Sequence, residues 1–280
     1  MKQGGSIMKK IKIRKFFTLL EVLVSMGVFS LLMLALMQFF SAAPGVWEKS
    51  GSKSELFDSA RIAAQLLTED LTTAFYGDEE HDMSKYKFYQ NDSTRLTFAA
   101  QRSGGLTEVD YNWNQTDLTL EIRELPETDN TASIGASGWV TYPSNAWITT
   151  IRGKTATPIA ENVLYANFGV DAMYRAPGDA NRPPRMVMAT FALLSSAGYD
   201  KLDTLLKSVK SDASESDIKG AVKGFFDKMT ESSKDKFKSV DDAVKQESDD
   251  PANFKAVSVP AKQIIFDNVQ FFKLIIPIER

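Results

Sequence analysis

The chain has 280 residues, 33 basic against 36 acidic, with a formal net charge of −3, one histidine and no cysteine. The lack of cysteine excludes disulfides and thiolate metal sites. The single histidine, His81, excludes metal sites with several histidines and leaves little room for a Ser-His-Asp arrangement. The acidic balance argues against a nucleic-acid partner.

The amino-terminal part of the chain combines a basic leader with an apolar stretch. Residues 1–15 hold six Lys and Arg and no acid, and residues 22–40 form a run of 19 residues without a charge. About 20 apolar residues span a bilayer, and the basic flank stays on the cytoplasmic side. The sequence therefore predicts one pass through the membrane, with everything from about residue 46 onward on the far side. Glu21 lies near the start of the longer apolar stretch of residues 16–40. A charge there costs on the order of 2.5–3.5 kcal/mol, which suggests that it has a function.

The order of these features, MKKIKIRK followed by FFTLLEVLVSMGVF, resembles the processing signal of type IV prepilins and type II secretion pseudopilins. The resemblance implies that prepilin peptidase cuts between Phe16 and Phe17 and that the new amino terminus, Phe17, is N-methylated. Thr18 is then the second mature residue and Glu21 the fifth. The family carries Gly or Ala before the cut where this chain has Phe16, and this departure leaves cleavage open.

The resemblance also implies an assembly role for the start of the helix. Glu21 is expected to pair with the amino-terminal nitrogen of a neighbouring subunit, because two opposite charges desolvated together cost less than either alone. Thr18, Leu19 and Leu20 belong to the same assembly segment. The implied partners are other pilins or pseudopilins, prepilin peptidase, an inner-membrane assembly platform and membrane lipid.

Two other interpretations of the amino terminus stay open. A secretory signal peptide would be cleaved after small residues, which Ser41-Ala42-Ala43 could supply, although its apolar core is usually only 7–15 residues long. A simple single-span anchor explains the length of the apolar stretch, but it does not explain the presence of the charged Glu21.

Beyond the membrane stretch the pattern predicts a helix and then an antiparallel sheet. Apolar residues recur every three to four positions in residues 56–75, which indicates an amphipathic helix. Between the membrane stretch and this helix, Pro44-Gly45 should kink or break the helix near the membrane surface. Alternating runs predict strands, with a hairpin loop at 114–117 and turns at Gly104-Gly105 and 176–184. The predicted strands are 95–99, 107–113, 118–125, 147–151, 163–174, 185–194, 256–260 and 269–276.

The late strands, VLYANFGVDAMY and RMVMATFALL around a Pro-rich turn, are similar to those of J-type minor pseudopilins and of Verru_Chthon cassette prepilin-like proteins. Residues 200–250 interrupt this pattern with many charged residues and with apolar residues at helical spacing, which predicts two or three solvated helices inserted between strands. Their role is open between a partner-binding lobe and a charged elaboration.

Two acidic patterns in the sequence resemble calcium sites. Asp110, Asn112, Asn114 and Glu121 match positions 1, 3, 5 and 12 of an EF-hand loop, but Gln115 occupies the position that needs glycine. The flanking alternation favours a hairpin there. The acidic run of residues 78–82 is better explained as solvated surface. No cofactor is expected, and no nucleophile motif such as G-x-S-x-G supports catalysis.

The sequence thus predicts an α+β protein whose long amino-terminal helix, transmembrane in its first half, packs on an antiparallel sheet domain with a charged helical insertion. The predicted function is that of a minor pseudopilin or pilin-like subunit in a type II secretion or type IV pilus-like filament of the inner membrane. The alternative is a single-span membrane-anchored periplasmic binding module that does not polymerise. The predicted parts are a leader (1–16), a transmembrane helix (17–43), an amphipathic helix (44–76), the sheet domain (77–199), the insertion (200–250) and closing strands (251–280).

Overall fold

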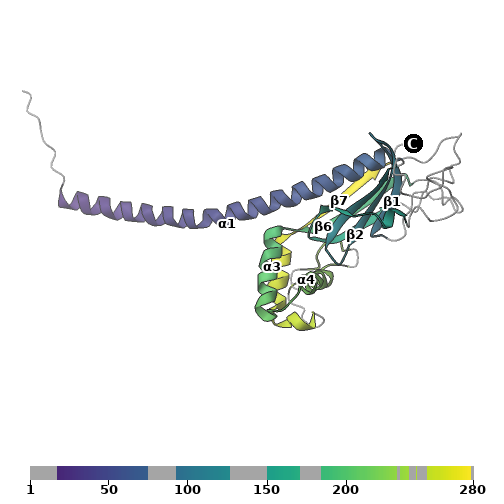
Figure 1. Ribbon diagram of the computed structural model, residues 1–280. Helices are drawn as coiled ribbons and strands as arrows, with labels where there is room; N and C mark the ends of the chain where they lie inside the picture. Colours follow the sequence, from purple (N-terminus) through teal and green to yellow (C-terminus); the bar gives the residue numbers. More distant parts are fainter. Residues whose placement is uncertain are drawn as a thin grey trace, which may run out of the picture. The chain divides into compact units, whose positions relative to one another are not determined.

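The computed structural model is a mixed helix-and-sheet protein with antiparallel sheets (Figure 1). The chain divides into two compact units, Met1–Ser50 and Gly51–Arg280, which are described separately below. The structure describes residues 18–74, 93–126, 150–170, 184–231, 234–239, 244 and 251–278.

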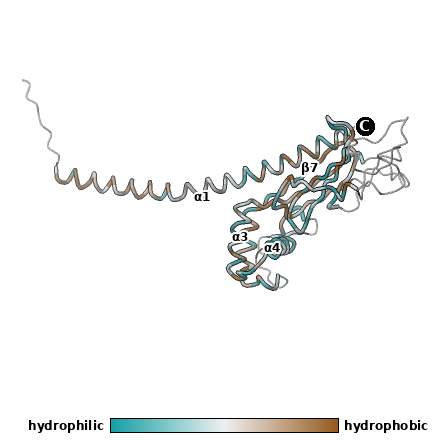
Figure 2. The backbone as a smooth tube through the Cα atoms, in the orientation of Figure 1, coloured by the Kyte–Doolittle hydropathy of each residue, from teal (hydrophilic) through white to brown (hydrophobic). Residues whose placement is uncertain are grey.

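Helix α1 (Leu19–Thr72) begins in the first unit. The predicted break at Pro44-Gly45 is wrong, because both residues have helical backbone. A proline inside a helix keeps φ near the helical value, but it removes one backbone hydrogen bond and crowds the carbonyl four residues before it. The helix therefore continues through Pro44 at a cost of about 3 kcal/mol. Figure 2 shows the hydrophobic colouring of the amino-terminal part of α1 giving way to a more polar colouring further along.

The part of α1 in the second unit is amphipathic, as predicted. Its buried side chains follow each other at intervals of three or four residues, the spacing that places them on one face of a helix. These are Leu56, Ala60, Ala63, Leu67 and Leu71.

The first sheet has four strands in the order β1-β2-β3-β4, with antiparallel pairing throughout. The strands are β1 (Arg95–Arg102), β2 (Gly105–Asn114), β3 (Thr119–Pro126) and β4 (Thr157–Ala160). The β1–β2 hairpin turns at Gly104 and Gly105, and Gly105 has a φ of 113°, a conformation that favours glycine. The β2–β3 loop lies where the sequence predicts it, although Leu118 belongs to the turn and not to the strand.

The second sheet has three antiparallel strands in the order β5-β6-β7. They are β5 (Val163–Val170), β6 (Met186–Leu194) and β7 (Val269–Pro277). Strands β6 and β7 pair along their whole length, from Met186 opposite Pro277 to Leu194 opposite Val269. The antiparallel pairing is confirmed, but the strands form two sheets where one was predicted.

The described residues between β6 and β7 are largely helical. It contains α3 (Ser196–Val209), α4 (Glu215–Met229), the 3₁₀ helix η2 (Ala252–Val257) and α6 (Ser258–Asn268). Ser195 caps α3 by accepting a hydrogen bond from the Gly198 N–H, and Ser214 forms a capping box with Asp217 at the start of α4. Figure 1 shows α3 and α4 gathered at one end of the sheets.

Two hydrophobic cores hold the second unit together. The first joins α1 to both sheets and includes Phe98, Tyr111, Phe168 and Phe191. The second joins α3, α4 and α6 to the other face of β5, β6 and β7 and includes Phe225 and Phe226. The helices of the predicted insertion therefore have a buried apolar face as well as a solvated one.

Among the described residues, two predicted strands are wrong and one observed strand was not predicted. Residues 150–152 are helical where an edge strand was expected, because the apolar residues of Trp147–Ile151 also fit the spacing of a helical turn. The strand predicted at 256–260 is wrong, since η2 and α6 cover it. Pro260 lies in the first turn of α6, where a missing N–H costs nothing. Strand β4 was not predicted because its four residues are too few to show the alternation of apolar and polar residues that indicates a strand.

Candidate functional site

The start of α1 holds the residues that the sequence marks for assembly. The Glu21 N–H donates to the Thr18 hydroxyl over 3.3 Å and to the Thr18 carbonyl over 3.0 Å, so Thr18 caps the helix. Glu21 lies in the first turn, where the positive end of the helix dipole favours a carboxylate. Phe16 and Phe17, the predicted cleavage site, lie outside the described residues.

The segment Leu19–Ser41 is long and apolar enough to cross a membrane. Its 23 residues extend about 34 Å at 1.5 Å per residue, against a hydrocarbon core of about 30 Å. All of its side chains are exposed, with Leu19 at 82% and Leu20 at 71%. The described chain therefore has one helix that could serve as a membrane anchor or as a signal sequence.

Polar groups within this helix are largely satisfied by the helix itself. The hydroxyls of Ser25 and Ser30 donate to the carbonyls of Glu21 and Met26 over 2.7 and 2.8 Å. Such hydrogen bonds spare a hydroxyl the cost of transfer into an apolar medium. Glu21 is the one charged residue of Leu19–Ser41, so its carboxylate is the group that most needs an external partner.

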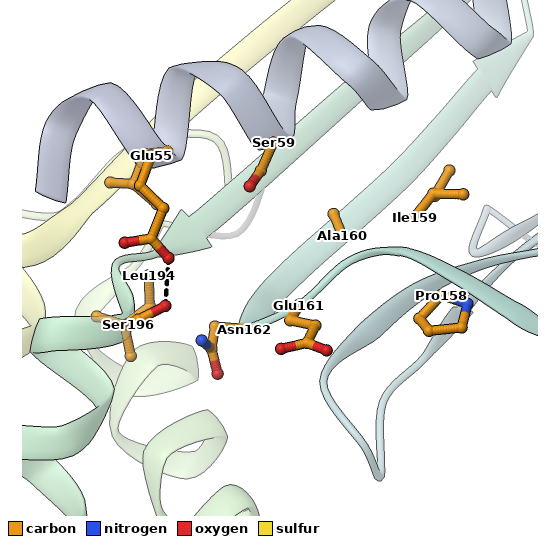
Figure 3. Close-up of a pocket in the computed structure, with 10 residues that line it drawn as sticks. Glu55, Ser59, Pro158, Ile159, Ala160, Glu161, Asn162, Leu194 and Ser196 are labelled. Atoms are coloured by element: carbon orange, nitrogen blue, oxygen red, sulfur yellow. Dashed lines mark hydrogen bonds between the residues drawn. The ribbon is translucent and has the colours of Figure 1, made fainter. Parts of the chain in front are cut away.

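The second unit has a polar cavity of about 260 Å³ between α1 and the β4–β5 turn (Figure 3). Glu55 and Ser59 of α1 face Glu161 and Asn162 of the turn across it. The Ser196 hydroxyl donates a hydrogen bond to the Glu55 carboxylate. A neighbouring cavity of about 310 Å³ shares Glu161, Asn162 and Ser196 with the first.

This second cavity is acidic. Asp117, Asp200 and Glu215 line it, together with Tyr199 and with Lys219, which pairs with Glu215 at 2.7 Å. Burial and the charges of Glu215, Asp203 and Asp200 raise the pKa of Tyr199 to about 12, so its hydroxyl stays protonated at neutral pH. In the part of the chain that the structure describes, no group of three or more Asp, Glu or His side chains could hold a metal ion.

The EF-hand-like spacing lies across the β2–β3 hairpin. The Asp110 carboxylate accepts hydrogen bonds from Arg95 at 2.6 and 2.7 Å and from Thr97 at 2.7 Å, and Arg123 donates to Glu121 over 3.0 Å. Arginine side chains thus hold these carboxylates, as they do in a structural network. The acidic run of residues 78–82 lies outside the described residues.

A buried polar network that the sequence analysis missed ties α1 to the first sheet. Asp70 is 3% exposed and accepts hydrogen bonds from Arg102 at 2.6 and 2.9 Å and from the Tyr111 hydroxyl at 2.6 Å. Burial alone lowers the pKa of Arg102, but Asp70 and Glu124 together raise it above its ordinary value. A signal was present, because Asp70 follows Leu67 by three residues and so lies on the apolar stripe of α1.

A second missed feature is Glu108 on β2. It is 1% exposed, and burial raises its pKa to about 8. Its cross-strand neighbours are Ala99 and Leu125, which offer no donors, and its Oε2 atom has no hydrogen-bond partner among the described residues. The alternation of Glu108 and Asp110 with apolar residues suggests a solvated face, so no sequence pattern predicts the burial of Glu108.

Comparison with protein families, with curated proteins and with solved structures finds no match for this chain.

Proposed function

We propose that the chain is a minor pseudopilin or pilin-like subunit that assembles into a filament through its amino-terminal helix. One observation carries the proposal: a basic leader and the order Phe-Thr-Leu-Leu-Glu precede a helix that is apolar on all sides except for the carboxylate of Glu21. This order resembles the processing signal of type IV prepilins and type II secretion pseudopilins.

The physical argument starts from the exposure of Leu19–Ser41. Such a surface is stable only in lipid or against other apolar helices. Helices in a membrane associate through dispersion forces and close packing. A charged group between them needs a partner of opposite charge. Glu21 in the first turn would find that partner in the amino-terminal amine of a neighbouring subunit, which would set the axial register.

In this proposal the chain performs no chemistry of its own. Prepilin peptidase removes the leader before Phe17, an inner-membrane platform lifts the subunit from the bilayer, and the second unit becomes part of the filament on the far side. Minor pseudopilins are thought to form the tip of such filaments, which push substrates through an outer-membrane pore.

The first test is the intact mass and amino-terminal sequence of the chain recovered from membranes with and without active prepilin peptidase. A terminus at N-methylated Phe17 is the expected result. A terminus just after Ala43 would contradict the proposal and indicate a cleaved signal peptide.

The second test is the Glu21→Ala variant, with Ser25→Ala as a matched control on the same helix. Glu21→Ala should still reach the membrane but lose incorporation into filaments, measured as the fraction recovered in sheared filament preparations. Ser25→Ala should assemble normally. Normal assembly of Glu21→Ala as well would contradict the proposal, because the carboxylate would then have no role in assembly.

The alternative is a single-span anchored module that binds a ligand and does not polymerise. The departure at Phe16 and the polar cavities around Glu161 support it. A chain that stays unprocessed in the presence of active peptidase, and that tolerates Glu21→Leu, would favour this alternative.

A further inference from the structure

Trp47 is the most exposed aromatic side chain of the described residues, at 78%. It belongs to the first unit and lies six residues after Ser41, the end of the segment that is long and apolar enough to cross a membrane. An indole joins a large apolar ring system to one N–H donor, so it prefers a place with an apolar side and a wet side. The position of Trp47 along α1 decides whether a membrane offers it such a place.

Helix α1 carries its uncharged surface beyond the membrane segment as far as Trp47. The backbone is helical up to and beyond Trp47, through Pro44 and Gly45. No charged residue occurs between Glu21 and Glu48, so Trp47 is the last residue of an uncharged run of 26 residues. Trp47 therefore lies at the boundary between the uncharged and the charged parts of the helix.

Trp47 also continues one face of the apolar helix. Phe29, Leu36, Phe40 and Trp47 follow each other at intervals of seven, four and seven residues, which places them along one side of a helix. The first three are 59%, 50% and 67% exposed. The face that ends in Trp47 is thus continuous with a surface that needs lipid or other apolar helices around it.

The length of the helix places Trp47 at the headgroup layer on the far side. Glu21 and Trp47 lie about 39 Å apart along the helix axis at 1.5 Å per residue, or about 37 Å across the bilayer at an average tilt of about 20°. The hydrocarbon core is about 30 Å thick, and the headgroup layers extend the bilayer to about 40–45 Å. With Glu21 at the inner edge of the hydrocarbon, the Trp47 backbone lies about 7 Å beyond the outer edge. Side chains on a helix lean toward its amino terminus, so the indole reaches back toward the hydrocarbon.

We propose that Trp47 is an interfacial anchor that binds the lipid headgroup layer on the far side of the membrane. The ring packs on the outermost part of the acyl chains, and its N–H donates to an ester carbonyl or a phosphate oxygen. A neighbouring apolar helix is a poorer partner, because it offers no acceptor for this N–H. Trp47 and Glu21 thereby fix the depth of α1 from its two ends. The proposal rests on the membrane span alone, which the filament subunit and the anchored module have in common.

The first measurement is the quenching of Trp47 fluorescence by lipids that are brominated at a known depth. The full chain is reconstituted in nanodiscs of phosphatidylethanolamine and phosphatidylglycerol, with bromine on the acyl chains either near the headgroup or near the methyl end. The signal of the Trp47→Phe variant is subtracted, which removes the contribution of the other three tryptophans. Bromine near the headgroup should quench the remaining signal at least about twofold more strongly.

The second measurement tests whether Trp47 sets the depth of the helix. The chain has no cysteine, so Gly45→Cys supplies a single reporter, and a Cβ at this position meets open space. The rate at which a water-soluble maleimide labels this cysteine reports its distance from the hydrocarbon. In Trp47→Leu the uncharged run exceeds the hydrocarbon thickness and has no anchor, so greater tilt should draw residue 45 inward and slow labelling at least about fivefold.

Two further variants separate the amphipathic ring from apolar bulk. Trp47→Tyr keeps a ring with a polar end and should label at the same rate as the Gly45→Cys parent. Phe40→Leu is the matched control, because it removes a ring on the same face within Leu19–Ser41, and it should also label at the rate of the parent. The urea midpoint of each variant checks that the second unit is folded.

Equal or stronger quenching by bromine near the methyl end would overturn the proposal, because Trp47 would then lie in the hydrocarbon. A lack of quenching by either lipid would also overturn it, since the ring would then contact protein or water. Unchanged labelling in Trp47→Leu, or equal slowing in Phe40→Leu, would overturn the role of Trp47 in setting the depth. None of these outcomes bears on cleavage before Phe17, so a failure here is distinguishable from a failure of the proposed function.

Discussion

The burial of Glu108 predicts a stability that falls as the pH rises. An unfolded glutamate titrates near pH 4.5, whereas the folded protein keeps the Glu108 carboxyl protonated up to about pH 8. Between these values the folded state binds one more proton than the unfolded state, so raising the pH favours unfolding. The contribution is fully present below about pH 4.5 and is lost as the pH passes through 8.

The expected magnitude follows from this difference of one proton. Each pH unit inside the window lowers the free energy of unfolding by about 1.4 kcal/mol, so crossing the whole window removes on the order of 5 kcal/mol. The Glu108→Gln variant keeps the shape of the side chain and cannot ionise. It should therefore lose this slope and be more stable than wild type at pH 8.

The assay is urea unfolding of the full chain in detergent at several pH values from 5.5 to 8, followed by tryptophan fluorescence, to which the buried Trp113 contributes. The difference in slope between wild type and Glu108→Gln isolates this group. The Glu69→Gln variant, in an exposed part of α1, controls for the loss of one negative charge. Equal slopes in wild type and Glu108→Gln would refute the reasoning, and an equal effect of Glu69→Gln would assign the slope to net charge.

Two further predictions concern packing in the second unit. In the Asp70→Ala variant, the free energy of unfolding measured with urea should fall by about 3 kcal/mol, because the buried Tyr111 hydroxyl and the Arg102 guanidinium lose their shared acceptor. A fall of less than about 1 kcal/mol would mean that water replaces the carboxylate. The Gly198→Ala variant should be destabilised by about 1–3 kcal/mol, because its Cβ would lie 2.6 Å from the Asn268 Cβ. Gly220 in α4 has open space around it, so Gly220→Ala should instead raise the free energy of unfolding by about 0.5–1 kcal/mol. If both glycine variants changed the free energy of unfolding in the same direction, the packing argument would be contradicted.

Alternation and helical spacing predicted the long elements of this fold because each reflects one local periodicity. The strands at 95–102 and 269–277 and the helices at 196–209 and 215–229 all carry such a pattern. The strand predicted at 256–260 failed because five residues satisfy both periodicities, and only packing in the second core decides between them.

The sheet organisation and the buried polar groups could not be read from local pattern. The division of the strands into two sheets depends on contacts between distant residues, such as Leu194 with Val269. Glu108 looks like a solvated position until its neighbours across the sheet are known. Asp70 lies on the apolar stripe of α1, but its partners Arg102 and Tyr111 are distant in the sequence and could not be predicted from that stripe. The assembly segment around Glu21 was predicted from residue order alone, and its proposed role is left to the experiments above.

The packing of α1 on the sheets also bears on how the protein is made. Phe57 of α1 contacts Phe272 of β7 edge to face, with ring centroids 5.5 Å apart. About 215 residues separate these rings along the chain, and at 5–20 residues per second the ribosome needs roughly 10–40 s to complete that distance. During that time the apolar face of α1 in the second unit exists without β7, the last of the described strands along the chain. A chaperone that shields this face, or a delay in translation, should therefore change the yield of folded protein more than its final stability.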